Sequence, residues 1–322
     1  MSKQIKPSGQ PLSKEAQTIL VTGGSGFIGR NFVKKMANEK VIVSLYHHRL
    51  PEPMTNVYPV CSDLSSPELL AAPLRGVDTV VYLAWERNFL GPAEIKGEST
   101  SRSRSKNITL LKNMVSAMEN SRAKRIVFIS ANGAQRNAKS EFLKEKYEGE
   151  LVVLNSKIPE KIIIRSNLVV DTHKGMDGFI KSILDLMKFP GFYPVPKFAN
   201  NLCPVHIDDL VDIISMASVI ERVDGCSIVE VVGQESLKID EFFRLVSNKY
   251  NPRNQVQIRG VLGNTLLPVF ERRSMDSLNS PRIRNFLTLN NERSKALSDR
   301  NPLLSRFSPS KRSIRKEMSK TH

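Results

Sequence analysis

Four glycines fall within seven residues near the start of this 322-residue chain. The stretch reads Thr22-Gly-Gly-Ser-Gly-Phe-Ile-Gly29, and it lies between a short apolar run, Thr18–Thr22, and helical periodicity over residues 27–38. So many glycines would weaken a helix start without some compensating role. A strand that enters a helix through such a turn presents helix N–H groups and the positive end of the helix dipole to an anion. The turn therefore predicts a strand–loop–helix unit that binds a phosphate-bearing dinucleotide.

Three of these glycines have separate expected roles. Gly23 permits a tight turn with positive φ. Gly26 leaves room for a pyrophosphate against the backbone, and Gly29 lets the helix pack closely on the strand.

Strand-like and helical patterns alternate over the first half of the chain. We expect helices over residues 27–38, 107–118 and 141–155, and strands over residues 18–22, 41–46, 57–61, 77–83, 125–130 and 161–170. Residues 77–83 are almost all apolar, as a strand buried on both faces requires. The alternation predicts an α/β fold with a Rossmann-type doubly wound parallel sheet.

The pattern loosens after residue 170, which predicts a small C-terminal substrate-side domain. A helix is expected over residues 178–188, a strand–helix unit over 205–220, a strand over 226–232 and a helix over 237–250. We assign residues 18–172 and 204–235 to the Rossmann domain, residues 173–203 and 236–298 to the substrate-side domain, and residues 1–17 to a flexible N-terminal segment. Residues 251–298 contain no recognisable motif.

The basic charge of the chain is concentrated partly at its end. The formal net charge is +16, and the last 31 residues hold nine basic side chains against three acidic ones. Serines alternate with these bases, so residues 299–322 are predicted to form a disordered basic tail. The tail could solubilise the chain, bind a protein partner or join a homodimer. It lacks interleaved aromatic residues, so nucleic acid is not the expected partner.

The three cysteines, Cys61, Cys203 and Cys226, are far apart in the sequence. They indicate a reduced, cytoplasmic protein without a disulfide framework, and no group of residues has metal-ligand spacing. No apolar run approaches the roughly 20 residues of a membrane span.

Several ordered motifs over residues 18–235 resemble the extended short-chain dehydrogenase/reductase family, also called the NAD-dependent epimerase/dehydratase family. The glycine turn is similar to the family's TGxxGxxG loop, and Asp63-Leu64 to the pair that contacts the adenine. The other matches are Val81-Tyr-Leu-Ala84, a helix opened by Asn107, and Pro204-Val-His-Ile-Asp-Asp209. The resemblance implies a nicotinamide dinucleotide in contact with Thr22, Gly23, Gly26, Phe27, Ile28, Gly29, His48, Arg49, Asp63, Leu64, Leu83, Ala84 and Lys146.

The end of the second predicted strand bears on which dinucleotide is bound. An acid at this point bonds the ribose 2′-hydroxyl, whereas a base accepts a 2′-phosphate. This chain reads Tyr46-His47-His48-Arg49, with no acid before Glu52. The sequence therefore favours NADP(H), and NAD(H) is the alternative.

The catalytic positions depart from the family's pattern, which has a YxxxK helix and a Ser or Thr on the fifth strand. The match of residues 145–150 to the family's SKxEGE makes Lys146 the lysine and puts Phe142 at the tyrosine. Ala131 stands at the Ser/Thr position. Tyr147 is turned about 100° from Lys146 around the helix, and Ser130 is expected on the opposite side of the strand from Ala131. Lys146, Ser130 and Tyr147 are the candidate catalytic residues.

Two functions therefore stay open. One is an epimerase, dehydratase or reductase acting on a small molecule, such as a sugar nucleotide or a similar carbonyl or alcohol, with Trp85, Arg87 and Asn200 as candidate substrate contacts. The other is a catalytically impaired nucleotide-binding scaffold or regulator, since Phe has no ionisable proton and Ala no hydroxyl. A nucleic-acid-associated protein is a weaker third reading, which rests on net charge alone.

Overall fold

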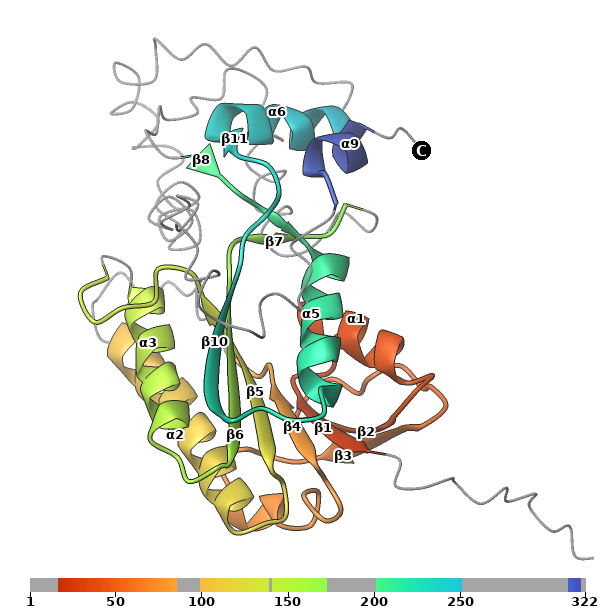
Figure 1. Ribbon diagram of the computed structural model, residues 1–322, viewed down its shortest axis with the longest axis vertical. Coiled ribbons are helices and arrows are strands. Elements are labelled where there is room, and N and C mark those ends of the chain that lie inside the picture. The colour runs from red at the N-terminus through yellow and green to blue at the C-terminus, as the bar shows by residue number, and fades with distance from the viewer. Residues whose placement is uncertain (1–16, 86–98, 139–140, 173–200, 251–311, 320–322) are drawn as a thin grey trace, which may run out of the picture.

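A seven-stranded parallel sheet forms the centre of the molecule (Figure 1). The computed structural model describes residues 17–85, 99–138, 141–172, 201–250 and 312–319. The strand order is β10-β6-β5-β4-β1-β2-β3. The strands are β1 (Thr18–Thr22), β2 (Val41–Tyr46), β3 (Val57–Cys61), β4 (Thr79–Tyr82), β5 (Arg125–Ala131), β6 (Glu160–Ser166) and β10 (Gly225–Val231).

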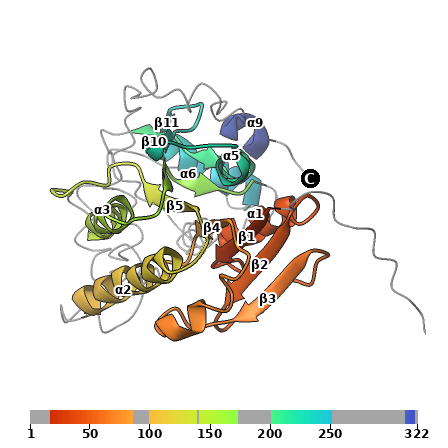
Figure 2. The ribbon, with the colours of Figure 1, turned by 60° about the horizontal axis from the view of Figure 1, so that its bottom comes forward.

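Helices cover both faces of this sheet (Figure 2). Helices α1 (Phe27–Met36) and α5 (Ile207–Val219) pack on one face, and α2 (Ser99–Glu119) and α3 (Glu141–Leu154) pack on the other. A short 3-10 helix, η1 (Pro67–Leu70), adjoins α2. The predicted Rossmann-type doubly wound sheet is thus confirmed.

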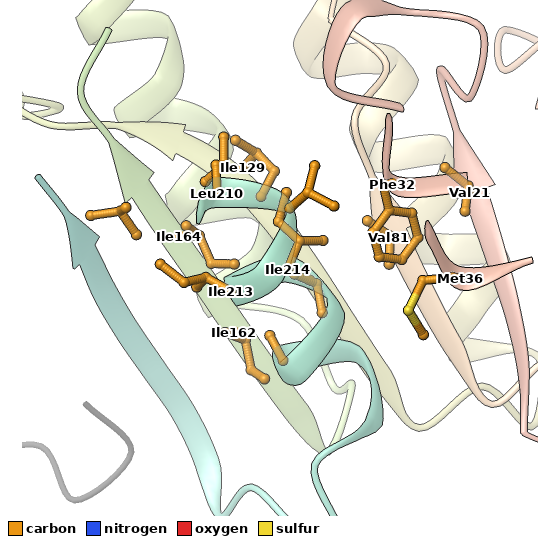
Figure 3. Packing of buried hydrophobic residues seen from close by; sticks show 14 of the residues in the cluster. Val21, Phe32, Met36, Val81, Ile129, Ile162, Ile164, Leu210, Ile213 and Ile214 are labelled. Atoms are coloured by element: carbon orange, nitrogen blue, oxygen red, sulfur yellow. The ribbon is translucent and has the colours of Figure 1, made fainter. Parts of the chain in front are cut away.

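The apolar spacing of α1 explains why it forms and how it sits. Its buried residues Gly29, Phe32, Val33 and Met36 follow a three- and four-residue spacing, so they share one face. That face meets Val21 and Val81 of the sheet, while Ile213 and Ile214 of α5 cover the neighbouring strands (Figure 3). The packing holds the first turn of α1 against the end of β1.

The strand order reverses between β1 and β4. From β1 the chain adds β2 and then β3 on one side, and β4, β5, β6 and β10 on the other. In doubly wound sheets, ligands bind in the crevice outside the carboxyl ends of the strands at this reversal. The glycine loop follows β1, so it lies at this position.

The segment over residues 161–170 differs from the single strand that its apolar character predicts. It divides into β6 and β7 (Val169–Val170), and β7 pairs with β9 (Val205–His206) outside the main sheet. Asn167 lies at the break, where its backbone N–H donates to Val231 O at 3.1 Å and its side chain to Cys203 O at 3.1 Å. After Asn167 the chain therefore no longer pairs with the strands of the seven-stranded sheet.

The remaining described elements lie beyond the carboxyl ends of the strands (Figure 1). They are β8 (Asn201–Leu202), its antiparallel partner β11 (Leu237–Lys238), and α6 (Ile239–Tyr250). The helix predicted over residues 178–188 lies outside the described residues. The assignment of a separate substrate-side domain stays a prediction.

Part of the chain terminus is ordered, contrary to the prediction of disorder over residues 299–322. Residues 314–319 form helix α9 (Ile314–Ser319), in which Ile314 and Met318 are buried. The prediction was wrong for this part because it counted the basic residues and overlooked two apolar side chains spaced four apart, which share a helix face.

Candidate functional site

The glycine loop is a close crossing of backbone segments. Gly23 has φ +68°, and a Cβ added there would lie 3.0 Å from the backbone nitrogen of Ala84. A Cβ added at Gly29 would lie 2.2 Å from the carbonyl oxygen of Gly23. Both approaches are to backbone atoms, which cannot rotate away, so glycine is required at both positions.

The first turn of α1 is open to an anion. Gly26 caps the helix in an extended conformation without a side-chain cap bond, and no acidic residue lies in the first turn. The first N–H groups of a helix have no partner within the helix. With the positive end of the helix dipole, these groups fit a diphosphate.

Thr22 ties the two strands at the sheet reversal together. Its hydroxyl oxygen accepts hydrogen bonds from the backbone N–H groups of Leu83 and Ala84, each at 3.0 Å. This bond network places the end of β4 directly beside Gly23. The predicted cofactor residues Thr22, Gly23, Leu83 and Ala84 therefore lie together.

The loops after β2 and β3 also meet. His47 Nε2 lies 3.8 Å from a carboxylate oxygen of Asp63, and the rings of His47 and His48 are 3.8 Å apart. The backbone N–H of Ser65 donates to Asp63 at 2.9 Å, and this bond lowers the pKa of Asp63. His48 and Arg49 are exposed beside this pair. His47, which the sequence reasoning did not select, is the histidine nearest Asp63.

Lys146 is buried against aromatic rings. Its ammonium group donates to Ile129 O at 2.9 Å and lies 3.7 Å from the Trp85 ring centre. The rings of Phe128 and Phe142 are 5.2 and 5.8 Å from the same nitrogen. We call Trp85, Phe128 and Phe142 the aromatic cage. A cation within about 6 Å of an aromatic ring centre is attracted to the face of that ring.

A buried carboxylate orients the cage. Glu145 accepts hydrogen bonds from the Trp85 indole nitrogen at 3.2 Å and from the Asn107 amide at 3.0 Å. The indole ring also packs on Phe128, with ring centres 5.8 Å apart. Trp85, which is half-buried, is held by these contacts, and its expected contact with substrate stays a prediction. Sequence reasoning missed Glu145, since nothing in a helix sequence marks one glutamate as buried.

Ala131 and Phe142, which the resemblance assigns to the Ser/Thr and Tyr positions, lie together in an apolar cluster. Ala131, Ala138 and Leu143 are buried in it, and Phe142 packs against them. No hydroxyl or ionisable group stands at either position.

Ser130 belongs to a different network. Its hydroxyl donates to Glu150 at 2.5 Å, and Glu150 lies about two helical turns beyond Phe142 along α3. Arg165 donates to the same carboxylate at 2.6 and 2.9 Å, and these bonds raise the pKa of Arg165. Ser130 is thus bonded in a charge network that joins α3 to the sheet, which explains why the hydroxyl is buried.

Two asparagines join the carboxyl ends of three strands beside Ala131. The Asn132 amide nitrogen donates to Asn167 Oδ1 at 2.8 Å and to Val231 O at 3.2 Å. Both acceptors fix the orientation of the amide, and its buried oxygen has no hydrogen-bond partner among the described residues. Buried acceptors without a donor are rare. This oxygen is therefore a candidate acceptor for an N–H or O–H of a bound molecule.

Several expected residues lie elsewhere. Arg87 and Asn200 fall outside the described residues, and Tyr147 is half-buried one position past Lys146. His206 accepts a hydrogen bond from Asp208 N and caps α5. Within the described ranges, no three His, Cys, Asp or Glu side chains could hold a metal ion, and no helix is long and apolar enough to cross a membrane.

Residues 23–168 match the family model for NAD(P)H-binding domains. Over this part, the chain resembles the extended short-chain dehydrogenase/reductase family. The residues of the glycine loop fit a nicotinamide dinucleotide: the helix start has no side-chain cap or acid that would oppose a diphosphate, and two glycines allow a close backbone approach.

Curated relatives include two mycobacterial steroid enzymes. The chain is 32% identical over 117 residues to a 3-beta-hydroxysteroid dehydrogenase of Mycolicibacterium neoaurum. This alignment covers 35% of this chain and 32% of the relative. The chain is 29% identical over 125 residues to a 3 beta-hydroxysteroid dehydrogenase/Delta 5-->4-isomerase of Mycobacterium tuberculosis, covering 38% and 33%. The matched stretch spans about a third of the length of these relatives.

Solved structures share the fold at low identity. A nucleoside-diphosphate-sugar epimerase from Staphylococcus aureus aligns with a TM-score of 0.65 at 14% identity, covering 94% of this chain and all of that one (100%). The Bordetella bronchiseptica enzyme WbmG in complex with NAD aligns with a TM-score of 0.61 at 15% identity, covering 78% and 84%.

Proposed function

We propose that this protein binds a nicotinamide dinucleotide without carrying out the tyrosine-dependent chemistry of its family, and serves as a nucleotide-binding scaffold or regulator. The observation that carries this proposal is the packing of Ala131 and Phe142 in one apolar cluster. An apolar cluster supplies neither a proton nor a hydrogen bond to a reacting oxygen. Losing a general acid–base costs about 10²- to 10⁴-fold in rate.

Lys146 supports the same proposal. In the family, this lysine lowers the pKa of the tyrosine and holds the nicotinamide ribose. Here the tyrosine is replaced, and the ammonium group contacts Ile129 O and the Trp85 ring. The lysine can still hold a ribose hydroxyl, but it has no phenol to activate.

The test measures dinucleotide binding by the wild type and turnover by a variant that regains a hydroxyl and a phenol at positions 131 and 142. Titration with NADPH and NADH should raise the melting temperature, because a ligand bound to the native state stabilises it. The wild-type chain should show no turnover with UDP-sugars or 3β-hydroxysteroids, while Ala131→Ser with Phe142→Tyr should gain measurable turnover. Wild-type turnover that Lys146→Ala abolishes would contradict the proposal.

We further propose that the preferred dinucleotide is NADP(H). His47, His48 and Arg49 are exposed after β2, where a 2′-phosphate would lie. The thermal shift with NADPH should therefore exceed that with NADH, and Arg49→Glu should reverse the order. Equal thermal shifts with NADPH and NADH, in the wild type and in Arg49→Glu alike, would refute the preference for NADP(H).

The second candidate function is catalysis: the protein would act as an epimerase, dehydratase or reductase on a sugar nucleotide or on a similar carbonyl or alcohol substrate. Structures of similar fold contain UDP or UDP-glucose, and the unpaired Asn132 oxygen beside Ala131 suits a hydroxyl donor. Mass spectrometry of the ligands that co-purify with the native protein separates the two functions. A sugar nucleotide whose affinity falls in Asn132→Leu would favour the enzyme, and a dinucleotide alone would favour the scaffold.

A further inference from the structure

The last described segment, residues 312–319, packs against α5 of the Rossmann part and against α6. In this segment, Ile314 and Met318 are buried, at 1% and 3% exposed. Helix α9 lies beside α6, near the start of α5 (Figures 1 and 2). The segment is thus seated on two elements that are far apart from it in the sequence.

Arg312 anchors the segment to α5. Its guanidinium pairs with Asp209, and its backbone N–H donates to the same carboxylate at 3.0 Å. Asp208 and Asp212 lie 3.7 and 3.9 Å from the guanidinium. Three acids on the first turns of α5 therefore lie near Arg312. Asp212 also pairs with Lys35, and Asp208 lies 3.6 Å from His206.

Arg315 anchors the segment to α6. Its guanidinium donates to Glu241 at 2.6 and 3.1 Å, and its backbone N–H donates to Glu235 at 3.0 Å. Ser313 donates to Glu235 at 2.6 Å, and Lys249 donates to Glu317 O at 2.8 Å. We call Asp208, Asp209, Asp212, Glu235 and Glu241 the acidic surface.

A second set of hydrogen bonds connects α5 and α6 in the protein interior. The Tyr250 hydroxyl, at the end of α6, donates to Thr172 O at 3.2 Å. Thr172 Oγ1 is 2.8 Å from His206 Nε2, and His206 caps α5. The segment joins α5 to α6 on the outside, where Tyr250, Thr172 and His206 join them on the inside.

We propose that the acidic surface is a peptide-docking site whose occupant is the chain's own basic C-terminal segment, which acts as an exchangeable clasp between α5 and α6. The clasp rests on two buried apolar side chains, on the pair of Arg312 with the buried Asp209, and on the exposed pair of Arg315 with Glu241, which is individually weak. It stays seated because its tether gives it a high effective concentration. The same sequence offered as a free peptide binds the surface when the tethered copy is displaced.

The clasp does not depend on the proposed function, because none of its residues belongs to the glycine loop or the aromatic cage. It also assigns a use to the basic tail. The acidic surface recognises Arg-x-x-Arg spacing with an apolar residue between the arginines, since Arg312, Ile314 and Arg315 each contact it or are buried beside it.

The test uses the full-length chain and a fluorescent peptide of residues 309–322. The variant Arg312→Glu with Arg315→Glu should release the clasp and bind the peptide at least about tenfold more tightly than the wild type, whose own segment competes. Binding should fall steeply near 1 M salt, where the Debye length is about 3 Å. The matched control, Arg75→Glu with Arg122→Glu, changes exposed arginines away from the surface and should bind like the wild type.

A second measurement keeps the proposal testable if the released variant is poorly folded. Exchanging the partners, with Glu241→Arg and Arg315→Glu together, should restore the hydrogen-exchange protection of α6 that Arg315→Glu alone reduces. Equal peptide binding by variant and wild type, equal binding of a scrambled peptide, or no rescue by the exchange would each overturn the clasp.

Discussion

The ammonium nitrogen of Lys146 lies 3.7 Å from the centre of the Trp85 ring while it donates a 2.9 Å hydrogen bond to Ile129 O. The lysine is 7% exposed, so both interactions are made in a largely dry environment. Trp85 itself is fixed by its bond to Glu145. The result is a cation held between α3, β5 and the end of β4.

We predict that Lys146→Met destabilises the fold by about 1–3 kcal/mol, because a buried carbonyl oxygen loses its donor. Trp85 is the single tryptophan of the chain, so its emission reports on this contact directly. Denaturant unfolding and the emission spectrum should both change. Lys144→Met, on the same helix but paired only with exposed Glu141, should change neither. Unaltered emission in Lys146→Met would contradict the contact.

The glycine loop gives a second prediction. Gly29→Ala should lose dinucleotide binding and about 1–3 kcal/mol of stability, because its Cβ would overlap Gly23 O. Gly76→Ala is a matched control, since Gly76 has φ +72° and open space around it. It should cost about 1–2 kcal/mol of backbone strain and leave the thermal shift with NADPH intact. Equal binding loss in both variants would show that the loop has no special role.

The sequence predicted the elements whose signals are local. The apolar strands, the periodicity of α1 and the glycine turn each depend on residues within a few positions of one another, and their alternation predicted a doubly wound parallel sheet. Pairing of Lys146 with Phe142 on one helix face also follows from their four-residue spacing.

The interactions that the sequence could not reveal are long-range. Arg312 and Asp209 are 103 residues apart, so a basic, serine-bearing segment looked disordered when considered alone. Glu145 meets Asn107 and Trp85 across 38 and 60 residues. Such contacts depend on how the elements are stacked, which composition and periodicity do not encode.

A third prediction concerns Ser130 and Glu150. Glu150→Ala should destabilise the chain by about 3–5 kcal/mol, because it leaves the Arg165 charge inside without its main partner. Ser130→Ala should cost only about 1 kcal/mol, the value of one hydrogen bond. If Ser130 acted in catalysis, Ser130→Ala would instead remove any turnover gained by Ala131→Ser with Phe142→Tyr while leaving stability nearly unchanged. Unfolding curves and turnover of the combined variants distinguish the two roles.

The last prediction is the pH dependence of the clasp. The hydrogen bond from Arg315 lowers the pKa of Glu241 from its ordinary value of 4.5. A carboxyl group whose pKa is lower in the docked state stabilises docking above pH 4.5, and this stabilisation is lost as the pH falls through the lowered pKa. Protection of α6 from hydrogen exchange should therefore be constant from pH 7 to about 5 and decline at lower pH.

Asp208, Asp209, Asp212 and Glu235 face the same segment, so they also contribute to its electrostatic attraction. Glu241→Gln separates the contributions: it should weaken the clasp at pH 7 and flatten part of the acid decline. Far-UV circular dichroism at each pH checks that the sheet is still folded. An identical acid profile in Glu241→Gln and the wild type would assign the decline to the other carboxylates and remove Glu241 from the mechanism.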